Sequence, residues 1–352
     1  MLGMTLAPMF HDAMGRTASR VDVTLIRLAL AASRRKGRRI RELNQRRRYY
    51  ESMGESYARL DDGTFYAAPP PARPFRERLV QKLPGGAVFD LAWSSNYEPR
   101  LSSARDNYLK WRENKTAHAR VFRHERAPKG AVLWIHGYRG GPLAIEQRIC
   151  RALELFESGL DVAMYVMPFH GVRAPLRSVA PLFPSQGSIE RTNEGFGQVV
   201  WELRSLAGWL RERGTPSVGV AGMSLGGYCA SLLATVDPTM AFVVPFIPLA
   251  DFTDAVVAHE TLRGIVIEPE LQEASRYALQ IHRPLARKAA VPADRILVIG
   301  AEADQITGRL HAELLARHFG SELAWFRGGH ILQYGRREGF KALIDFAGKH
   351  AA

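Results

Sequence analysis

The sequence predicts an α/β fold in which helices cover both faces of a mostly parallel central sheet. From Lys129 onward, apolar runs alternate with longer stretches whose apolar residues recur at helical spacing. The runs are continuously apolar, which is typical of strands that are buried on both faces of a parallel sheet. This alternation of strand and helix patterns favours parallel strands that are joined by right-handed crossovers.

Eight segments are predicted as strands of this sheet, two before Lys129 and six after it. In chain order they are 87–95, 118–126, 131–136, 161–167, 217–223, 241–249, 295–301 and 321–326. Helical spacing is clearest at 199–210 and at 340–347. Ligands of such sheets gather beyond the carboxyl ends of the strands, so residues that directly follow these strands are the candidates for function.

Residues 1–74 are predicted to form a basic, largely helical N-terminal extension, and residues 75–352 the α/β domain. Of the formal net charge of +13, most lies in residues 1–50, which hold twelve basic and three acidic residues. The stretch AAPPPARP, residues 67–74, marks the boundary as a stiff connector. Three interpretations of the basic segment stay open: a helix packed on the domain with solvated arginines, a helix on an anionic membrane surface, or an organelle-targeting segment.

Contact with nucleic acid is disfavoured, because no aromatic residues are interleaved with the arginines. The two cysteines, Cys150 and Cys229, are predicted to be buried thiols within helices in a reducing compartment. They form no CxxC pair and indicate neither a zinc site nor a redox motif. The N-terminal apolar runs are too short for a secretory signal or a membrane span. These features favour a cytoplasmic protein, with peripheral membrane contact through residues 1–50 as the alternative.

Ser224 lies in a G-x-S-x-G pattern between an apolar strand run and a helical pattern. The pattern alone has low specificity, but a sharp strand-to-helix turn is the setting that raises a serine hydroxyl above a sheet edge. Gly222 and Gly226 leave space where the strand and helix backbones approach each other. Ser224 is therefore predicted to be a nucleophile at a helix N-terminus, whose unpaired amides favour developing negative charge.

A serine nucleophile needs a histidine that removes its proton and a carboxylate that orients the histidine. His330 is the preferred base, because it follows the strand run 321–326 behind two glycines and precedes the last helix. Asp304, just beyond the strand run 295–301, is the preferred acid. Asp251, which follows the run 241–249, is the alternative acid.

The oxyanion of the reaction would be bound by two backbone amides. One is predicted to be the amide of Leu225, the residue after the nucleophile. The other is predicted to be the amide of Tyr138 in HGYRGG, residues 136–141, which follows the first core strand.

Further candidate substrate contacts come from two segments at strand ends. His136 and Gly137 belong to HGYRGG, and His170 and Arg173 belong to PFHGVRAP, residues 168–175. For the second segment, a purely structural loop is the alternative.

HGYRGG, GMSLGG, Asp304 and His330, with serine, acid and histidine in this chain order, resemble the α/β-hydrolase superfamily from about Ala87 to the C-terminus. The extended N-terminal region with WIHGYRGG, MPFHGVRAP and FRGGH is similar to the branch of alpha/beta-hydrolase domain-containing protein 18. The resemblance implies a serine hydrolase that cleaves carboxylic esters, lipid or other acyl esters included, through an acyl-enzyme intermediate. It implies no cofactor and no metal.

Members of the superfamily commonly insert a lid after the sixth strand, which corresponds to residues 251–293 here. Apolar positions of this stretch would wall an acyl pocket; they are Val256, Val257, Leu262, Ile265, Val266 and Ile267. An ordinary crossover helix with a long connection explains the same stretch nearly as well.

Two other functions stay open at this stage. An acyltransferase would use the same triad and exclude water, and a non-enzymatic membrane-docking protein would use the hydrolase body as a scaffold. The sequence shows no missing triad residue, which favours an enzyme. Removal of residues 1–50 is expected to leave activity on a short soluble ester largely intact and to weaken binding to anionic vesicles.

Overall fold

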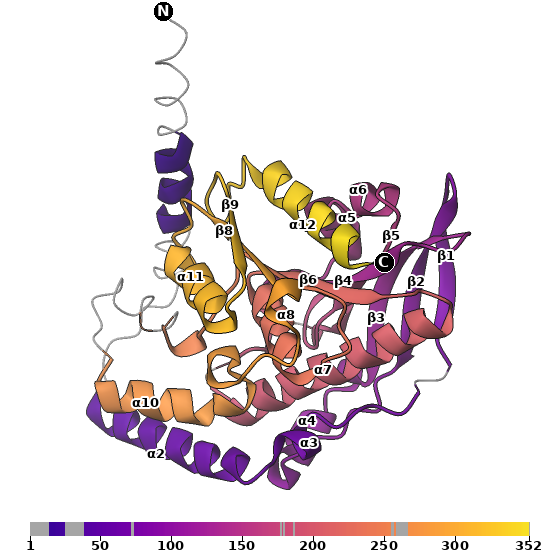
Figure 1. The fold of residues 1–352 in the computed structure, drawn as a ribbon. Coiled ribbons are helices and arrows are strands. Elements are labelled where there is room, and N and C mark those ends of the chain that lie inside the picture. The colour runs from indigo at the N-terminus through magenta and orange to yellow at the C-terminus, as the bar shows by residue number, and fades with distance from the viewer. Residues whose placement is uncertain are drawn as a thin grey trace, which may run out of the picture.

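The computed structural model describes residues 14–24, 39–71, 74–176, 178, 180–185, 187–254, 257 and 267–351. Its centre is a nine-stranded sheet in the order β1-β2-β3-β5-β4-β6-β7-β8-β9 (Figure 1). The strands are β1 Arg76–Leu83, β2 Gly86–Ser94, β3 Thr116–His124, β4 Gly130–Ile135, β5 Leu160–Val166, β6 Val218–Met223, β7 Val243–Phe246, β8 Leu297–Ala301 and β9 Glu322–Phe326.

The six strands β4 to β9 run parallel to their neighbours among themselves. Strands β1, β2 and β3 are antiparallel additions at one side of the sheet. The predicted mostly parallel sheet is therefore confirmed. Because β4 to β9 point the same way, the loops that follow them share one edge of the sheet, which we call the carboxyl edge.

Helices cover both faces of the sheet (Figure 1). One face carries α7 Ile189–Glu212, α8 Leu225–Val236 and α11 Gly308–Phe319, and the other carries α5 Leu143–Ile149, α6 Ala152–Glu157 and α12 Arg336–His350. Leu133 and Ile135 of β4 pack in the first core, whereas Val132 and Trp134 pack in the second. Successive side chains of a strand point to opposite faces, so two cores account for the continuous apolar run of this strand.

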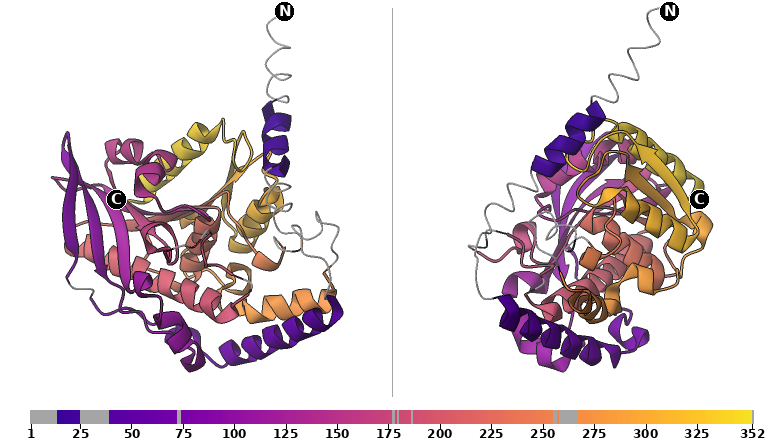
Figure 2. Two further views of the ribbon diagram at one scale, coloured as in Figure 1. Left: turned by 180° about the vertical axis from the view of Figure 1, so that it is seen from behind. Right: turned by 90° about the vertical axis from the view of Figure 1, so that its left-hand side faces the viewer.

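The N-terminal helix α2 Arg39–Ala58 lies along α10 Pro269–Ala278 (Figures 1 and 2). Tyr50 of α2 packs there in a small apolar core with Leu271 and Ala274 of α10. A helix of the predicted extension thus covers part of the stretch that is predicted as a lid. Residues 1–13 and 25–38 lie outside the described residues, so the division at residue 74 and the contact of residues 1–50 with membranes stay predictions.

A second helical segment, residues 14–24, lies beside the loops after β8 and β9 (Figure 1). The remaining helices are short. Among the described residues they include α3 Asp62–Phe65, α4 Arg105–Leu109, a helical stretch at 252–254 and the 3-10 turns Ser102–Ala104, Arg112–Lys115, Gly171–Arg173, Gln280–His282, Pro284–Ala286 and Ala293–Arg295. No helix within the described ranges is both long enough and apolar enough to cross a membrane.

The stretch 251–293 contains α10 and two of these 3-10 turns. Of its apolar positions, Ile267 packs at the rim of the small core around Tyr50. The positions Val256, Leu262, Ile265 and Val266 lie outside the described residues, so the choice between a lid and a crossover stays open.

Two strands differ from the sequence pattern. The pattern misses β1, because its residues are charged and mostly exposed, as befits a strand at the sheet edge. Strand β7 ends at Phe246 although the apolar run continues to residue 249, because Ile247 has a φ of 40° and Pro248 has no amide hydrogen.

Both cysteines are free and buried, as predicted. Cys229 lies within α8, whereas Cys150 follows the last residue of α5 rather than lying inside a helix.

Candidate active site

Ser224 occupies a sharp turn between β6 and α8. Its backbone has φ 58° and ψ −112°, a conformation that residues with a Cβ atom rarely adopt. The Ser224 amide donates to the Phe246 carbonyl at 2.9 Å, and the Ser224 carbonyl accepts from the Tyr228 amide at 3.0 Å. The neighbouring strand and the following helix thus hold a strained turn at the carboxyl edge.

Glycines allow three backbones to meet at this turn. A Cβ atom on Gly222 would overlap the carbonyl of Gly226, and a Cβ atom on Gly226 would overlap the carbonyl of Ile135 at the end of β4. The same approach brings the segment after β4 beside the serine, since a Cβ atom on Gly137 would lie 3.5 Å from the Cβ of Ser224. Because these positions lack side chains, the turn at Ser224 and the segment after β4 can lie in direct backbone contact.

His330 joins Ser224 to Asp304. His330 Nε2 lies 3.0 Å from Ser224 Oγ, and His330 Nδ1 lies 2.8 Å from Asp304 Oδ2. A carboxylate only accepts hydrogen bonds, so Nδ1 carries the proton and the lone pair of Nε2 faces the serine hydroxyl. Three residues predicted from separate segments thus lie within the reach that proton transfer requires.

The Asp304 carboxylate is held by its own loop. Oδ1 accepts from the amides of Ile306, Thr307 and Gly308 at 2.8, 3.0 and 3.2 Å, and Oδ2 accepts from the Thr307 hydroxyl at 2.7 Å. Burial alone would raise the pKa of Asp304. The electrostatic attraction of the neighbouring His330 side chain and the hydrogen bonds from His330, Thr307 and Gly308 outweigh burial and lower this pKa to about 2. Asp304 is therefore ionised at neutral pH.

Asp251, the alternative acid, has other partners. Its Oδ2 accepts from Arg283 Nε and Nη2 at 2.9 and 2.6 Å, and its Oδ1 accepts from the amides of Thr253 and Asp254. Among the interactions of the described residues, none joins Asp251 to His330. The geometry therefore favours Asp304 as the residue that orients the histidine.

The two predicted oxyanion amides belong to segments that adjoin the serine. Leu225 is the first residue of α8, so its amide has no acceptor within the helix. Tyr138 lies in a turn that is closed by a 3.0 Å hydrogen bond from the Gly140 amide to the Gly137 carbonyl. The Gly141 amide in turn donates to the buried carboxylate of Glu146 at 3.1 Å. The turn that carries the Tyr138 amide is thus fixed next to Ser224.

His136 is buried and its ring binds backbone groups. Nε2 accepts from the Met167 amide at 3.1 Å, so Nδ1 carries the proton and lies 2.7 Å from the Gly137 carbonyl oxygen. Burial and the neighbouring His170 lower the pKa of His136 to about 3. The expectation that His136 contacts substrate is corrected: its neutral ring ties the turn after β4 to the loop after β5.

His170 lies beneath the Tyr138 ring, with the ring centroids 6.0 Å apart in an edge-to-face arrangement. The His170 side chain is buried, its Nδ1 lies 2.9 Å from the Pro168 carbonyl oxygen, and its Nε2 is a buried atom without a hydrogen-bond partner among the described residues. Burial lowers its pKa to about 4. In this structure His170 supports the turn around Tyr138 and is itself shielded from a substrate.

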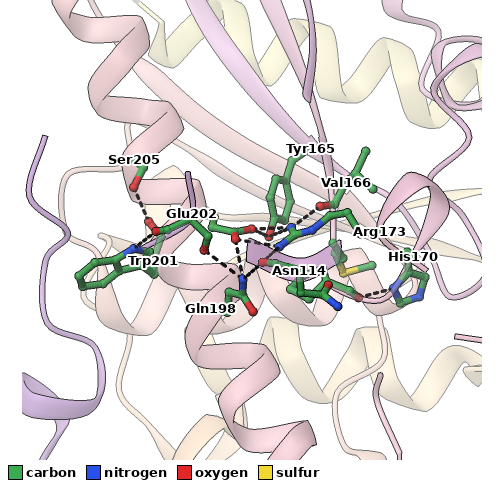
Figure 3. A network of polar contacts seen from close by, with 12 residues as sticks. Asn114, Tyr165, Val166, His170, Arg173, Gln198, Trp201, Glu202 and Ser205 are labelled. Atoms are coloured by element: carbon green, nitrogen blue, oxygen red, sulfur yellow. Dashed lines mark hydrogen bonds and ion pairs between the residues drawn. The ribbon is translucent and has the colours of Figure 1, made fainter. Parts of the chain in front are cut away.

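Arg173 anchors the same loop in a buried polar network (Figure 3). The side chains of Arg173 and Glu202 are both 0% exposed, and two parallel hydrogen bonds of 2.6 and 2.9 Å join them. Arg173 also donates to the carbonyls of Val166 and Asn114, and the Tyr165 hydroxyl contacts Glu202. The expectation that Arg173 contacts substrate is therefore corrected, because protein atoms enclose its guanidinium completely.

Two acidic residues that hold this site are absent from the sequence predictions. Glu202 has a recognisable signal, because an acid on the apolar stripe of α7 indicates a buried partner. Asp22 accepts hydrogen bonds from amides beside Asp304 and at His330, and no pattern in the basic segment points to this role. Within the described part of the chain, no group of three or more His, Cys, Asp or Glu side chains is placed to hold a metal ion.

Comparison with known proteins matches residues 112–262 to the family described as Alpha/beta hydrolase domain containing 18. Two relatives are uncharacterized proteins of Mycobacterium tuberculosis, one from strain CDC 1551 / Oshkosh and one from strain H37Rv. Each is 27% identical over 278 residues, which cover 76% of this chain. This chain spans 65% of the length of these relatives.

Solved structures of esterases share the fold. An acetyl xylan esterase from Paenibacillus sp. R4 superposes with a TM-score of 0.55 at 16% identity and covers 85% of this chain and 93% of its own. An S-formylglutathione hydrolase from Agrobacterium tumefaciens gives a TM-score of 0.54 at 14% identity and covers 80% of this chain and 100% of its own. At these identities the likeness concerns the fold alone.

Proposed function

We propose that the chain is a serine hydrolase that cleaves carboxylic esters, in keeping with its esterase-like fold and with the match of residues 112–262 to the family described as Alpha/beta hydrolase domain containing 18. The observation that carries the proposal is the unbroken series of contacts from Ser224 Oγ through His330 to Asp304. The strained backbone of Ser224 supports it, because strain of this kind is retained where a function requires it.

In the proposed reaction, Ser224 Oγ attacks the ester carbonyl carbon while His330 Nε2 takes the hydroxyl proton. The ionised Asp304 stabilises the imidazolium that forms, and the amides of Leu225 and Tyr138 bind the oxyanion. When the tetrahedral intermediate collapses, the bond to the alcohol oxygen breaks and His330 returns the proton to the leaving alcohol. Water then attacks the acyl-enzyme with the same base, and the carboxylic acid is released.

Exposed apolar side chains on the loops of the carboxyl edge support an ester with an apolar group. Tyr138 follows β4, Val172 and Leu176 follow β5, and Ile331 directly follows His330; all four side chains are exposed. Apolar groups that border a few polar catalytic atoms are typical of small-molecule sites. Acyl esters, lipid esters included, are therefore the proposed substrate class.

The test compares the wild type with Ser224→Ala. A fluorophosphonate probe should label the wild type and leave the variant unlabelled, because the serine oxygen is the atom that forms the bond to phosphorus. Turnover of p-nitrophenyl esters, measured over a series of acyl-chain lengths, should fall by about 10⁴-fold or more in the variant. Equal labelling of both proteins would contradict the assignment of the nucleophile.

A further inference from the structure

We infer that Asp22, in the N-terminal helical segment 14–24, is a positioning residue that holds the loops of Asp304 and His330 in their reactive arrangement. Its effect on turnover rests on the proposed function, whereas its effect on the two loops is a separate structural consequence. We call the Asp22 carboxylate with its three backbone donors the Asp22 clamp.

The clamp joins two loops of the carboxyl edge through one side chain. Asp22 Oδ2 accepts from the His330 amide at 2.8 Å and from the Gln305 amide at 3.2 Å, and Asp22 Oδ1 accepts from the Ile331 amide at 3.1 Å. Gln305 directly follows Asp304. The carboxylate therefore binds the backbone at the base itself and at the residue next to the acid.

Because the Asp22 carboxylate is buried, it needs these hydrogen bonds when the segment 14–24 lies on the loops. Asp22 is 0% exposed, and so is Ala18, one helical turn earlier. A buried carboxylate is unfavourable unless hydrogen bonds satisfy it, and the three amides supply charge-assisted bonds of the stronger kind. The segment 14–24 thus meets the loops through a fully bonded acidic group, although most of the charge in residues 1–50 is basic.

Gly329 shows the same contact from the side of the loop. A Cβ atom on Gly329 would lie 2.7 Å from Asp22 Oδ2 and 3.2 Å from the Ala18 carbonyl oxygen. Gly329 does not have a positive φ, so its backbone conformation does not by itself require glycine. The space that the docked helix occupies is what excludes a side chain here.

Other hydrogen bonds also join the two loops, and they limit how far the loops can move when the Asp22 clamp is lost. The Ala303 amide donates to the Gly328 carbonyl at 2.9 Å, and the contact between Asp304 and His330 is itself a link. Loss of the clamp should therefore loosen the loops without separating them. Misplacement of a catalytic group by about 1 Å costs about 10²-fold in rate, so a partial loss of position should lower turnover by about 10- to 100-fold.

This role reverses an expectation drawn from the sequence. If residues 1–50 served only to dock the protein on a membrane, they would be dispensable for activity on a short soluble ester. Their removal takes Asp22 away and leaves the amides of Gln305, His330 and Ile331 without this acceptor. A loss of activity is therefore expected on deletion, whether or not the segment contacts a membrane.

The kinetic test uses Asp22→Asn in the full chain, with Arg20→Gln as the matched control. Asparagine keeps the shape of Asp22 but has one acceptor oxygen, and its amide group would face a backbone donor. Arg20 is exposed on the same helix and also changes by one unit of charge. With p-nitrophenyl butyrate, Asp22→Asn should lower kcat by about 10- to 100-fold with KM within about threefold, whereas Arg20→Gln should stay within about twofold of wild type.

A second measurement, hydrogen exchange, tests the clamp without any activity. Asp22→Asn should speed exchange in residues 303–307 and 328–333, and Arg20→Gln should not. Gly329→Ala, which disturbs the same contact from the loop, should reproduce the faster exchange and the lower kcat.

The outcomes separate this inference from the proposed function. The positioning role is overturned if hydrogen exchange in both loops is the same in Asp22→Asn as in wild type. It is also overturned if the wild type is active and Asp22→Asn has the same kcat. If the wild type hydrolyses no ester and binds no fluorophosphonate, the proposed function is contradicted. Faster exchange in Asp22→Asn than in this wild type would still support the clamp.

Discussion

The two sides of the candidate active site are held by different means. On the serine side, close backbone contacts at glycines fix the turns after β4 and β6, and the buried pair of Arg173 and Glu202 fixes the adjoining loop after β5. On the histidine side, the loops after β8 and β9 are joined by Asp22, which lies 308 positions before His330 in the chain. One side is part of the central sheet and its core, whereas the other depends on a docked N-terminal segment.

This difference separates stability from turnover. Substitutions on the serine side should damage the fold, because the groups that hold the turns are also buried core groups. Substitutions in the Asp22 clamp should loosen two surface loops while the sheet stays intact. The largest effect is expected at Asp304, the acid of the histidine side.

Asp304→Asn should have the largest effect, because it leaves the histidine side folded but removes the charge that orients and stabilises the imidazolium. We expect kcat on p-nitrophenyl esters to fall by about 10⁴-fold. Asp251→Asn is the matched control, since Asp251 contacts Arg283 and not His330. The acid is misassigned if Asp251→Asn shows the larger loss of kcat.

The comparison also explains which site residues the sequence predicts. Ser224 directly follows its apolar run, and Asp304 and His330 lie in the loops that follow theirs; parallel strands bring such positions to one edge. Asp22 has no comparable pattern, because its partners are backbone amides that carry no residue identity and lie far along the chain. Local sequence therefore predicts the three side chains that are proposed to react and misses the group that holds their loops.

The same reasoning applies to the fold and to the corrected residues. Buried parallel strands such as β4 are predictable from continuous apolar runs, whereas β1 is exposed and charged at an edge and has no such run. Arg173 follows a strand as a catalytic residue would, and only the position of Glu202 in space shows that its charge is neutralised inside the core. A polar residue after a strand thus predicts a position at the carboxyl edge. Whether that residue is structural or contacts substrate depends on the side chains that it meets in the fold.

Arg173→Met should have the next largest effect, on stability rather than on turnover chemistry. It leaves the Glu202 carboxylate buried without its cation, which costs about 3–5 kcal/mol of the free energy of unfolding. Urea unfolding should show this loss, and the double variant Arg173→Met with Glu202→Leu should recover part of it, because no unpaired charge remains.

Lys341→Met is the control for this prediction, since Lys341 and Asp345 form an exposed pair on α12. We expect no measurable change in its unfolding midpoint. An Arg173→Met protein of wild-type stability with a reduced kcat would break the separation between the two sides.

The smallest effect concerns pH, and it sharpens the view that the serine side is part of the core. Burial lowers the pKa of His170 from its ordinary value of 6.5 to about 4. Between these two values the unfolded chain binds the proton and the folded chain does not, so the fold loses stability as the pH falls. The contribution of His170 is about 1.4 kcal/mol per pH unit and about 3 kcal/mol in total by pH 4.

His170→Phe removes this titration and keeps an aromatic ring beside Tyr138 and Phe183. At pH 8 its free energy of unfolding should lie within about 1 kcal/mol of wild type, because one hydrogen bond to the Pro168 carbonyl is lost. On going from pH 8 to pH 5, the variant should lose about 2 kcal/mol less than wild type in urea unfolding. His318→Gln, at an exposed position of α11, should keep the wild-type dependence. Equal acid sensitivity of His170→Phe and wild type would mean that the ring is protonated within the fold, and that this part of the serine side is open to water rather than built into the core.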